Sequence, residues 1–113
     1  IYGLGAPPDA EAWRVGVFDP TTARALPDAV DLRDSALSVS AVHGKSFTRD
    51  GRVYGHVIDP RTGEPANVAR LAAVWGPSAT DTDALSTALL VLGEAGVATL
   101  SDRMPGYRGL VLK

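Results

Sequence analysis

The sequence predicts an α+β fold in which a mainly antiparallel sheet carries a helix pair packed on one face. Three observations lead to this prediction. Short β-branched or alternating segments, separated by turn residues, occupy the first two thirds of the chain. After Gly76-Pro77 the apolar residues change to the spacing of an amphipathic helix. The length of 113 residues provides one hydrophobic core but not two ordinary domains, so residues 1–113 are expected to form a single unit.

The first half of the chain is predicted to form a meander of short strands. Residues 1–12 are rich in Gly, Pro and Ala and are expected to form a loop. Asp19-Pro20 ends the first strand, and Asp50-Gly51 is a strong turn signal inside residues 40–52, which are expected to be a polar surface loop. The segments with strand-like alternation are residues 13–18, 29–32 and 35–40.

Residues 53–58 contain the first candidate for chemistry. They are β-branched and aromatic, which predicts a buried or half-buried strand with His56 inside it. Asp59-Pro60 stops this strand in a turn, with Gly63 close behind. A histidine near charged residues at the carboxyl end of a strand indicates a binding site. The alternative is a core histidine with satisfied hydrogen bonds above an Asx-Pro turn, and these residues alone leave both interpretations open.

The last third of the chain is predicted to contain a buried strand, two helices and a final strand. The apolar run at residues 71–75 is the strand. The first helix is expected to begin at Thr80 and to end at Gly93, followed by a second helix at residues 94–101 and a strand at residues 109–112. The expected apolar face of the first helix consists of Leu85, Ala88, Leu89 and Leu92.

Polar residues concentrate at the start of the first helix, and they admit two interpretations. With Thr80 as the N-cap, Asp83 would complete a capping box with Asp in place of Glu, at the positive end of the helix dipole. Alternatively, Asp83 and Thr87 lie four residues apart, so their oxygens project from one face and could both bind a hard cation such as Mg²⁺. Magnesium fills much of its shell with water and phosphate oxygens, so two protein ligands are sufficient.

Composition excludes several kinds of chemistry. The chain has no cysteine, which rules out disulfides, thiolate nucleophiles and thiolate metal sites. Its net charge of -2 gives no reason to expect nucleic-acid binding by bulk charge. No apolar run approaches the length of a membrane-spanning segment. The hydrophobic content of 45% with 21% charged residues is typical of a soluble globular chain.

Two motifs carry a resemblance to a known family. The first is His-Val-Ile-Asp-Pro-Arg-Thr-Gly-Glu-Pro at residues 56–65, and the second is Thr-Asp-Ala-Leu-Ser-Thr-Ala-Leu at residues 82–89, followed by Val-Leu-Gly. In this order they resemble the ApbE family, the FAD:protein FMN transferases. The resemblance extends over nearly the whole chain but covers only the C-terminal portion of the family's domain. We therefore expect the N-terminal portion, which supplies much of the flavin-binding surface and part of the metal shell in the family, to be absent from this chain.

The resemblance implies a Mg²⁺-dependent transfer of the FMN part of FAD to a threonine or serine hydroxyl of a target protein, with release of AMP. Some members of the family hydrolyse FAD instead. By position, Asp83 and Thr87 match the family's metal-binding pair, and His56 matches a histidine near the flavin phosphates that is discussed as a base. Ser40, His56 and Asp59 are the predicted cofactor-binding residues, with Asp59 shaping the turn rather than reacting.

The chain departs from the family pattern in one loop and leaves three hypotheses open. Where the family commonly has Thr-Ser-Gly followed by an aromatic residue, this chain has Val39-Ser40-Ala41-Val42. It could be an FMN transferase, a non-catalytic flavin- or nucleotide-binding module, or one half of a site completed by a second chain. A large exposed apolar face would favour the third hypothesis over the second. The sequence specifies neither the acceptor protein nor the compartment, the cell envelope or the cytoplasm of a bacterium.

Overall fold

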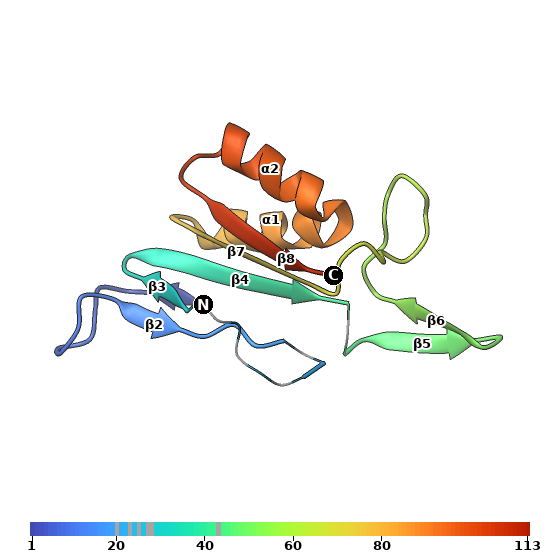
Figure 1. Cartoon of the computed structure of the whole chain (residues 1–113), viewed down its shortest axis with the longest axis horizontal. Coiled ribbons are helices and arrows are strands. Elements are labelled where there is room, and N and C mark those ends of the chain that lie inside the picture. The colour runs from blue at the N-terminus through green and yellow to red at the C-terminus, as the bar shows by residue number, and fades with distance from the viewer. Residues whose placement is uncertain (20, 23, 25, 27–28, 43) are drawn as a thin grey trace.

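A four-stranded antiparallel sheet forms the centre of the protein, and two helices pack on one of its faces (Figure 1). The computed structural model describes residues 1–19, 21–22, 24, 26, 29–42 and 44–113. Its strands are β1 (Tyr2–Gly3), β2 (Trp13–Val15), β3 (Val30–Leu32), β4 (Ser35–Ala41), β5 (Ser46–Arg49), β6 (Arg52–Gly55), β7 (Leu71–Gly76) and β8 (Arg108–Leu112). Its helices are α1 (Ala79–Leu92) and α2 (Glu94–Arg103). The predicted α+β fold, with a mainly antiparallel sheet and a helix pair, is confirmed.

The central sheet has the order β1-β4-β7-β8, and its neighbouring strands are all antiparallel. Because successive side chains of a strand point to opposite faces, β7 contributes to two cores. Ala72 and Val74 pack with Leu90 under the helices. Leu71 and Ala73 pack on the other face, which the ribbon of β2 and β3 covers (Figure 1). The sheet is therefore the middle of three layers. Neither helix in the described part of the chain has the length and apolar character needed to cross a membrane.

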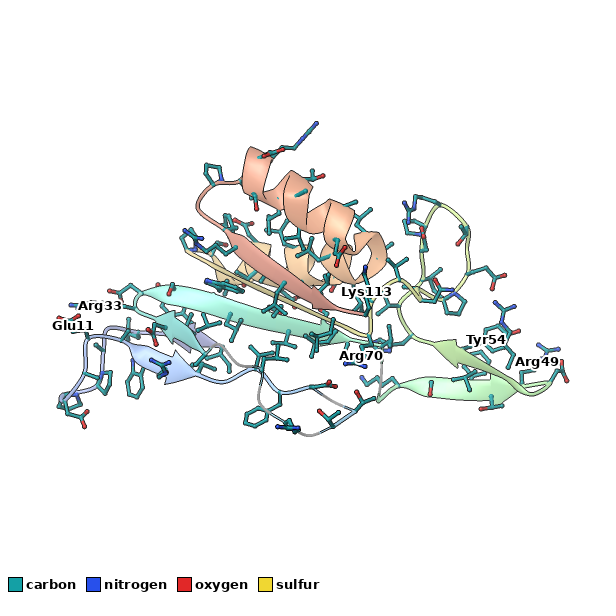
Figure 2. The ribbon with its side chains drawn as sticks, in the orientation of Figure 1. Glu11, Arg33, Arg49, Tyr54, Arg70 and Lys113 are labelled. Carbon is teal, nitrogen blue, oxygen red and sulfur yellow. The ribbon has the colours of Figure 1, made fainter. Side chains whose placement is uncertain are left out.

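Within residues 40–52, β4 continues to Ala41, and β5 and the start of β6 form a hairpin, so the prediction of a surface loop throughout is wrong. Asp50-Gly51 is the turn, as predicted, and both residues have positive φ, 52° and 75°. This conformation matches the twist of a two-residue hairpin. The rings of Phe47 and Tyr54 stack across the two strands with centroids 5.1 Å apart, and Arg52 lies 5.2 Å from the Tyr54 centroid. These cross-strand pairs stabilise a ribbon whose polar sequence gives no alternation signal. The hairpin extends away from the central sheet, with Tyr54 and Arg49 distant from the helices (Figures 1 and 2).

Two predictions for the N-terminal segment need correction. Residues 1–12 contain the short strand β1, which pairs with β4 through Tyr2↔Ala36, and are not entirely a loop. The strand predicted at residues 13–18 ends at Val15, where its pairing with β3 stops. The predicted terminator Pro20 lies outside the described residues. Pairing with a distant partner decides where these strands begin and end, and local composition does not contain that information.

Helix α1 begins earlier than predicted. Ser78 is the N-cap, because its Oγ accepts a hydrogen bond of 3.2 Å from the amide of Asp81. Thr80 therefore lies within the first turn, and the predicted capping box with Asp83 does not form. The predicted end is confirmed: the amide of Gly93 donates to the Leu89 carbonyl at 2.8 Å, with a φ of 66° at Gly93.

The buried face of α1 is more polar than the predicted stripe. Leu89 is buried, but Ala88 and Leu92 are exposed. The buried residues of α1 are Thr82, Ser86, Leu89, Leu90 and Val91. Both hydroxyls are buried because they have hydrogen-bond partners: Thr82 donates to the carbonyl of Ala79 at 3.0 Å, and Ser86 contacts hydroxyls of β4.

Gly76, the last residue of β7, lies against the ring of Tyr107. A Cβ atom at Gly76 would lie 2.3 Å from Cδ1 of Tyr107. The Tyr107 side chain is buried, and its hydroxyl donates to Oδ2 of Asp81 in the first turn of α1. This hydrogen bond raises the pKa of Tyr107 above its ordinary value. The ring is thus held from both sides and has little room to move.

The Gly76→Ala substitution is expected to destabilise the protein by about 1–3 kcal/mol, because the added methyl group overpacks a site with no free space. The measurement is the denaturant midpoint of unfolding at neutral pH. Gly106→Ala is the matched control, since a Cβ at Gly106 meets nothing within 4 Å. Equal midpoints for the two variants would show that the Tyr107 ring yields freely.

A buried carboxylate connects the segment after β2 to the start of β7. Asp19 is buried, and its Oδ2 accepts a hydrogen bond of 2.8 Å from Nη2 of Arg70. Its Oδ1 accepts a hydrogen bond of 2.9 Å from the amide of Thr21. Hydrogen bonds from Thr21, together with the charge of Arg70, lower the pKa of Asp19 below its ordinary value.

This lowered pKa makes a prediction about acid stability. A carboxyl group whose pKa is lower in the folded state stabilises the fold above its unfolded-state pKa, and this contribution is lost as the pH falls through the folded-state pKa. The Asp19→Asn variant is therefore expected to be less stable than the wild type at pH 7 and to lose less stability between pH 7 and about pH 3. Denaturant midpoints at the two pH values test this, with the exposed Asp102→Asn as control. Parallel losses in the wild type and Asp19→Asn would contradict it.

Candidate functional site

His56 lies directly after β6, at the base of the β5–β6 hairpin. Strand pairing ends at Ser46↔Gly55, where β5 begins, so the prediction that His56 lies inside a strand is wrong. The side chain is exposed, so the core-histidine interpretation is wrong as well. Its Nδ1 lies 3.0 Å from the carbonyl oxygen of Lys45. Since a carbonyl only accepts, Nδ1 carries the proton and donates, and Nε2 of the neutral ring is left as a proton acceptor.

The side chain and the carbonyl of Asp59 both accept hydrogen bonds within the turn at residues 59–63, which follows His56 in the sequence. Its carbonyl oxygen accepts a hydrogen bond of 2.8 Å from the amide of Gly63, and its Oδ2 accepts one of 2.7 Å from Nη2 of Arg61. Oδ1 accepts a further bond of 2.9 Å from Nε of Arg61. These hydrogen bonds from Arg61 lower the pKa of Asp59 below its ordinary value, so the carboxylate is ionised at neutral pH. The geometry explains a turn-shaping role, and contact of Asp59 with a cofactor stays a prediction.

Hydroxyl groups of β4 and α1 meet above the central sheet. Ser38 and Ser40 are two residues apart on β4 and therefore point to the same face, toward α1. Oγ of Ser40 lies 2.8 Å from Oγ of Ser86 and 3.1 Å from Oγ1 of Thr87. Oγ of Ser38 donates to Oδ1 of Asp83 at 3.3 Å. The fold thus brings Ser38 to Asp83 and Ser40 to Thr87, and the residues of each pair are more than forty positions apart in the sequence.

An open cavity of about 490 Å³ lies beside this cluster. It is lined by Val39, Ser40, Ala41, His56, Val57, Ile58 and Thr87. Three predicted site residues, Ser40, His56 and Thr87, therefore share one cavity, and Asp83 lies one helical turn before Thr87. Asp59 instead lines a separate cavity of about 250 Å³, so the structure does not bring it to the others.

Asp83 and Thr87 have the properties of a cation site with few protein ligands. Both side chains are exposed, and in the described part of the chain Oδ2 of Asp83 has no hydrogen-bond partner. Carboxylate and hydroxyl oxygens are hard donors that suit Mg²⁺. The described residues include no group of three or more His, Cys, Asp or Glu side chains that could hold a metal. A magnesium ion at this pair would therefore take most of its ligands from water and phosphate oxygens.

Sequence reasoning missed Ser38 and Ser86, which connect the predicted residues. Ser86 is fully buried, and its Oγ is 3.2 Å from Oγ of Ser38. A signal for Ser38 was present, because a residue two positions before Ser40 on a strand shares its face. Ser86 lies three residues after Asp83 and shares its helix face. The contact between the two elements depends on how α1 packs on β4.

Comparison with known proteins shows the family to which this fold belongs. The family model described as the ApbE family matches residues 1–111. The chain therefore belongs to the ApbE family. It is 37% identical over 102 residues to the FAD:protein FMN transferase of Treponema pallidum, covering 88% of this chain and 28% of that protein.

Two crystal structures are similar to the whole described fold. The ApbE protein of Thermotoga maritima has a TM-score of 0.79 and 30% sequence identity, covering 95% of this chain and 35% of that one. The flavinyl transferase ApbE of Pseudomonas stutzeri, in its apo form, has a TM-score of 0.65 and 30% identity, covering 96% and 37%. This chain thus spans roughly a third of the length of these two proteins and 28% of the Treponema protein.

Proposed function

We propose that this chain carries part or all of the active site for transfer of FMN from FAD to a threonine or serine hydroxyl of an acceptor protein, with release of AMP. The observation that supports this function is the cavity shared by Ser40, His56 and Thr87, with Asp83 one helical turn away. The names of the relatives support the reaction class, since they are FAD:protein FMN transferases.

In this proposal the exposed oxygens of Asp83 and Thr87 hold Mg²⁺, and the pyrophosphate of FAD lies beside them. When bound, Mg²⁺ would neutralise the charge that develops on the phosphate oxygens. Ser40 lies within hydrogen-bond distance of Thr87 and lines the same cavity, so it is suited to orient the hydroxyl of Thr87. Asp59 contributes through the shape of the turn that follows His56.

His56 acts as the general base. The acceptor hydroxyl oxygen forms a bond to the phosphorus of the FMN half of FAD, and the bond from this phosphorus to the bridging oxygen breaks, so AMP leaves with that oxygen. The hydroxyl proton passes to Nε2 of His56. The hydrogen bond from Nδ1 to the Lys45 carbonyl keeps the ring in the tautomer that can accept it. An exposed imidazole in an open cavity is accessible to a protein side chain.

A second candidate is a composite site completed by polypeptide that this chain does not contain. An apolar cavity of about 340 Å³ lies along the outer side of α1, lined in part by Ile58, Ala88 and Leu92. Ile58 and Leu92 are 48% and 42% exposed. Exposed apolar surface next to a site favours a covering partner over a self-sufficient binding module.

AMP release from FAD by the purified chain with Mg²⁺ tests the proposal. The chain is assayed with and without a threonine-containing acceptor peptide, and the peptide mass reports attached FMN. AMP together with a flavinylated peptide is the expected result, whereas AMP without peptide modification indicates hydrolysis of FAD. AMP that appears only after addition of the N-terminal portion of the Treponema relative would establish the composite site. FAD binding without AMP under any of these conditions would overturn the transferase and leave a binding module.

A further inference from the structure

Four hydroxyl groups form an unbroken chain of contacts from Thr87 to Asp83. In order, the oxygen–oxygen distances are 3.1 Å from Thr87 to Ser40, 2.8 Å from Ser40 to Ser86, 3.2 Å from Ser86 to Ser38 and 3.3 Å from Ser38 to Oδ1 of Asp83. Each of the four contacts joins a residue of α1 to a residue of β4. It begins and ends at the two side chains that the proposed function assigns to the metal.

The direction of these hydrogen bonds follows from the chemistry of the last acceptor. An ionised carboxylate only accepts, so Ser38 must donate its single proton to Asp83. Ser38 then accepts the proton of Ser86, and Ser86 accepts the proton of Ser40. Ser40 has no proton left for Thr87, so it accepts from Thr87. The lone pairs of Thr87 Oγ1 are consequently free to face a cation.

Two hydrogen bonds from side chains to the backbone of α1 compete with these hydroxyl contacts but do not reverse their direction. Ser86 Oγ lies 3.0 Å and Thr87 Oγ1 lies 3.3 Å from the carbonyl oxygen of Asp83. Ser86 and Thr87 are the donors in these contacts too. Each can share its proton between the Asp83 carbonyl and the neighbouring serine hydroxyl, so the donor and acceptor roles along the row of hydroxyls do not change. Full burial of Ser86 keeps water away from the hydrogen bonds that its own hydroxyl makes.

We propose that Ser38, Ser86 and Ser40 form a hydroxyl relay that positions the two metal ligands, with Ser86 as its buried centre. The relay holds Oδ1 of Asp83, which leaves Oδ2 for the cation, and it directs the proton of Thr87 away from the cation. Ser38 and Ser86 are positioning residues, because neither lines the cavity of about 490 Å³. This inference rests on the proposed function, since it assigns Mg²⁺ to Asp83 and Thr87.

Magnesium affinity of the purified chain, measured by titration calorimetry, is the first test. Ser86→Ala and Ser38→Ala are each expected to weaken binding about tenfold or more, the lower end of what outer-shell substitutions cost. Ser38→Thr keeps the hydroxyl and is expected to restore affinity. Thr82→Val is the matched control, because it removes a buried hydroxyl of α1 that bonds only the Ala79 carbonyl among the described residues. Loss of either serine interrupts the relay, so a second substitution removes nothing further. The Ser38→Ala/Ser86→Ala double variant is therefore expected to bind Mg²⁺ no more weakly than the weaker single variant.

Side-chain rotamers in the metal-free chain are the second test and separate the two proposals. Three-bond scalar couplings at Asp83 and Thr87 are expected to report one χ1 rotamer each in the wild type and averaged rotamers in Ser86→Ala and Ser38→Ala. Wild-type chain that binds no Mg²⁺ would overturn the metal assignment of the proposed function. Couplings in these variants that equal those of the wild type and of Thr82→Val would overturn the relay, whether or not Mg²⁺ binds.

Discussion

Replacement of Asp83 by alanine is expected to reduce AMP release from FAD by about 10³-fold or more. Charge stabilisation by a bound cation contributes several kcal/mol to such a reaction, and a loss of about 4 kcal/mol corresponds to this factor. Alanine removes the only charged oxygen of the proposed Asp83–Thr87 pair. The assay follows AMP at saturating Mg²⁺, with the N-terminal portion of a relative added if the chain alone proves inactive.

Two measurements separate a lost cation from a damaged fold. Because Ser78 and not Thr80 caps α1, Asp83 does not complete a capping box, and Asp83→Ala is expected to change the denaturant midpoint of the metal-free chain only slightly. Asp102→Ala, on the exposed side of α2, makes the same change of charge away from the site and is expected to keep full activity. Full activity in Asp83→Ala would remove the metal assignment, and equal losses in both variants would indicate an effect of net charge.

The His56→Asn substitution is expected to lower kcat by about 10²- to 10⁴-fold, the range that general acid–base catalysis contributes. Asparagine can place an amide N–H near the position of Nδ1 and keep the hydrogen bond to the Lys45 carbonyl, but it has no basic nitrogen in place of Nε2. The loss is therefore expected in kcat and not in the affinity for Mg²⁺. Steady-state kinetics and magnesium titration of the same variant measure the two quantities.

A chemical rescue distinguishes a base from a binding group. His56→Ala leaves space in an open cavity, and added imidazole is expected to recover part of the activity because it supplies a proton acceptor where Nε2 had been. Imidazole is not expected to change the rate of the wild type or of Asp83→Ala. A His56→Asn variant with wild-type kcat would show that another group accepts the proton.

Local features of the sequence were sufficient for several elements. The apolar run of β7, the helical spacing of α1 and its stop at Gly93 were all predicted from neighbouring residues, because burial on both faces, amphipathic period and a left-handed C-cap leave local signals. The Asp50-Gly51 turn was found for the same reason. The two motifs also identified the ApbE family, which the family match over residues 1–111 confirmed.

Contacts between distant residues decided what the sequence left open. All residues of β5 and the first two residues of β6 are exposed, so this hairpin has no apolar alternation and depends on the pair Phe47 and Tyr54. The end of β6 before His56 depends on where β5 begins. Ser78 replaced Thr80 as the cap because helix ends are set by one hydrogen bond, which composition cannot locate.

The sequence by itself determined the fold class and the family, and it predicted the site residues Ser40, His56, Asp59, Asp83 and Thr87. Only the tertiary structure decided that Ser40, His56 and Thr87 share a cavity, that Asp59 lines a separate one, and that a buried serine connects hydroxyls of β4 with α1. The physical reason is that hydrogen bonds across β4 and α1 join residues more than forty positions apart. The geometry of these hydrogen bonds follows from the packing of α1 on the sheet, and the spacing of residues along the sequence does not predict it.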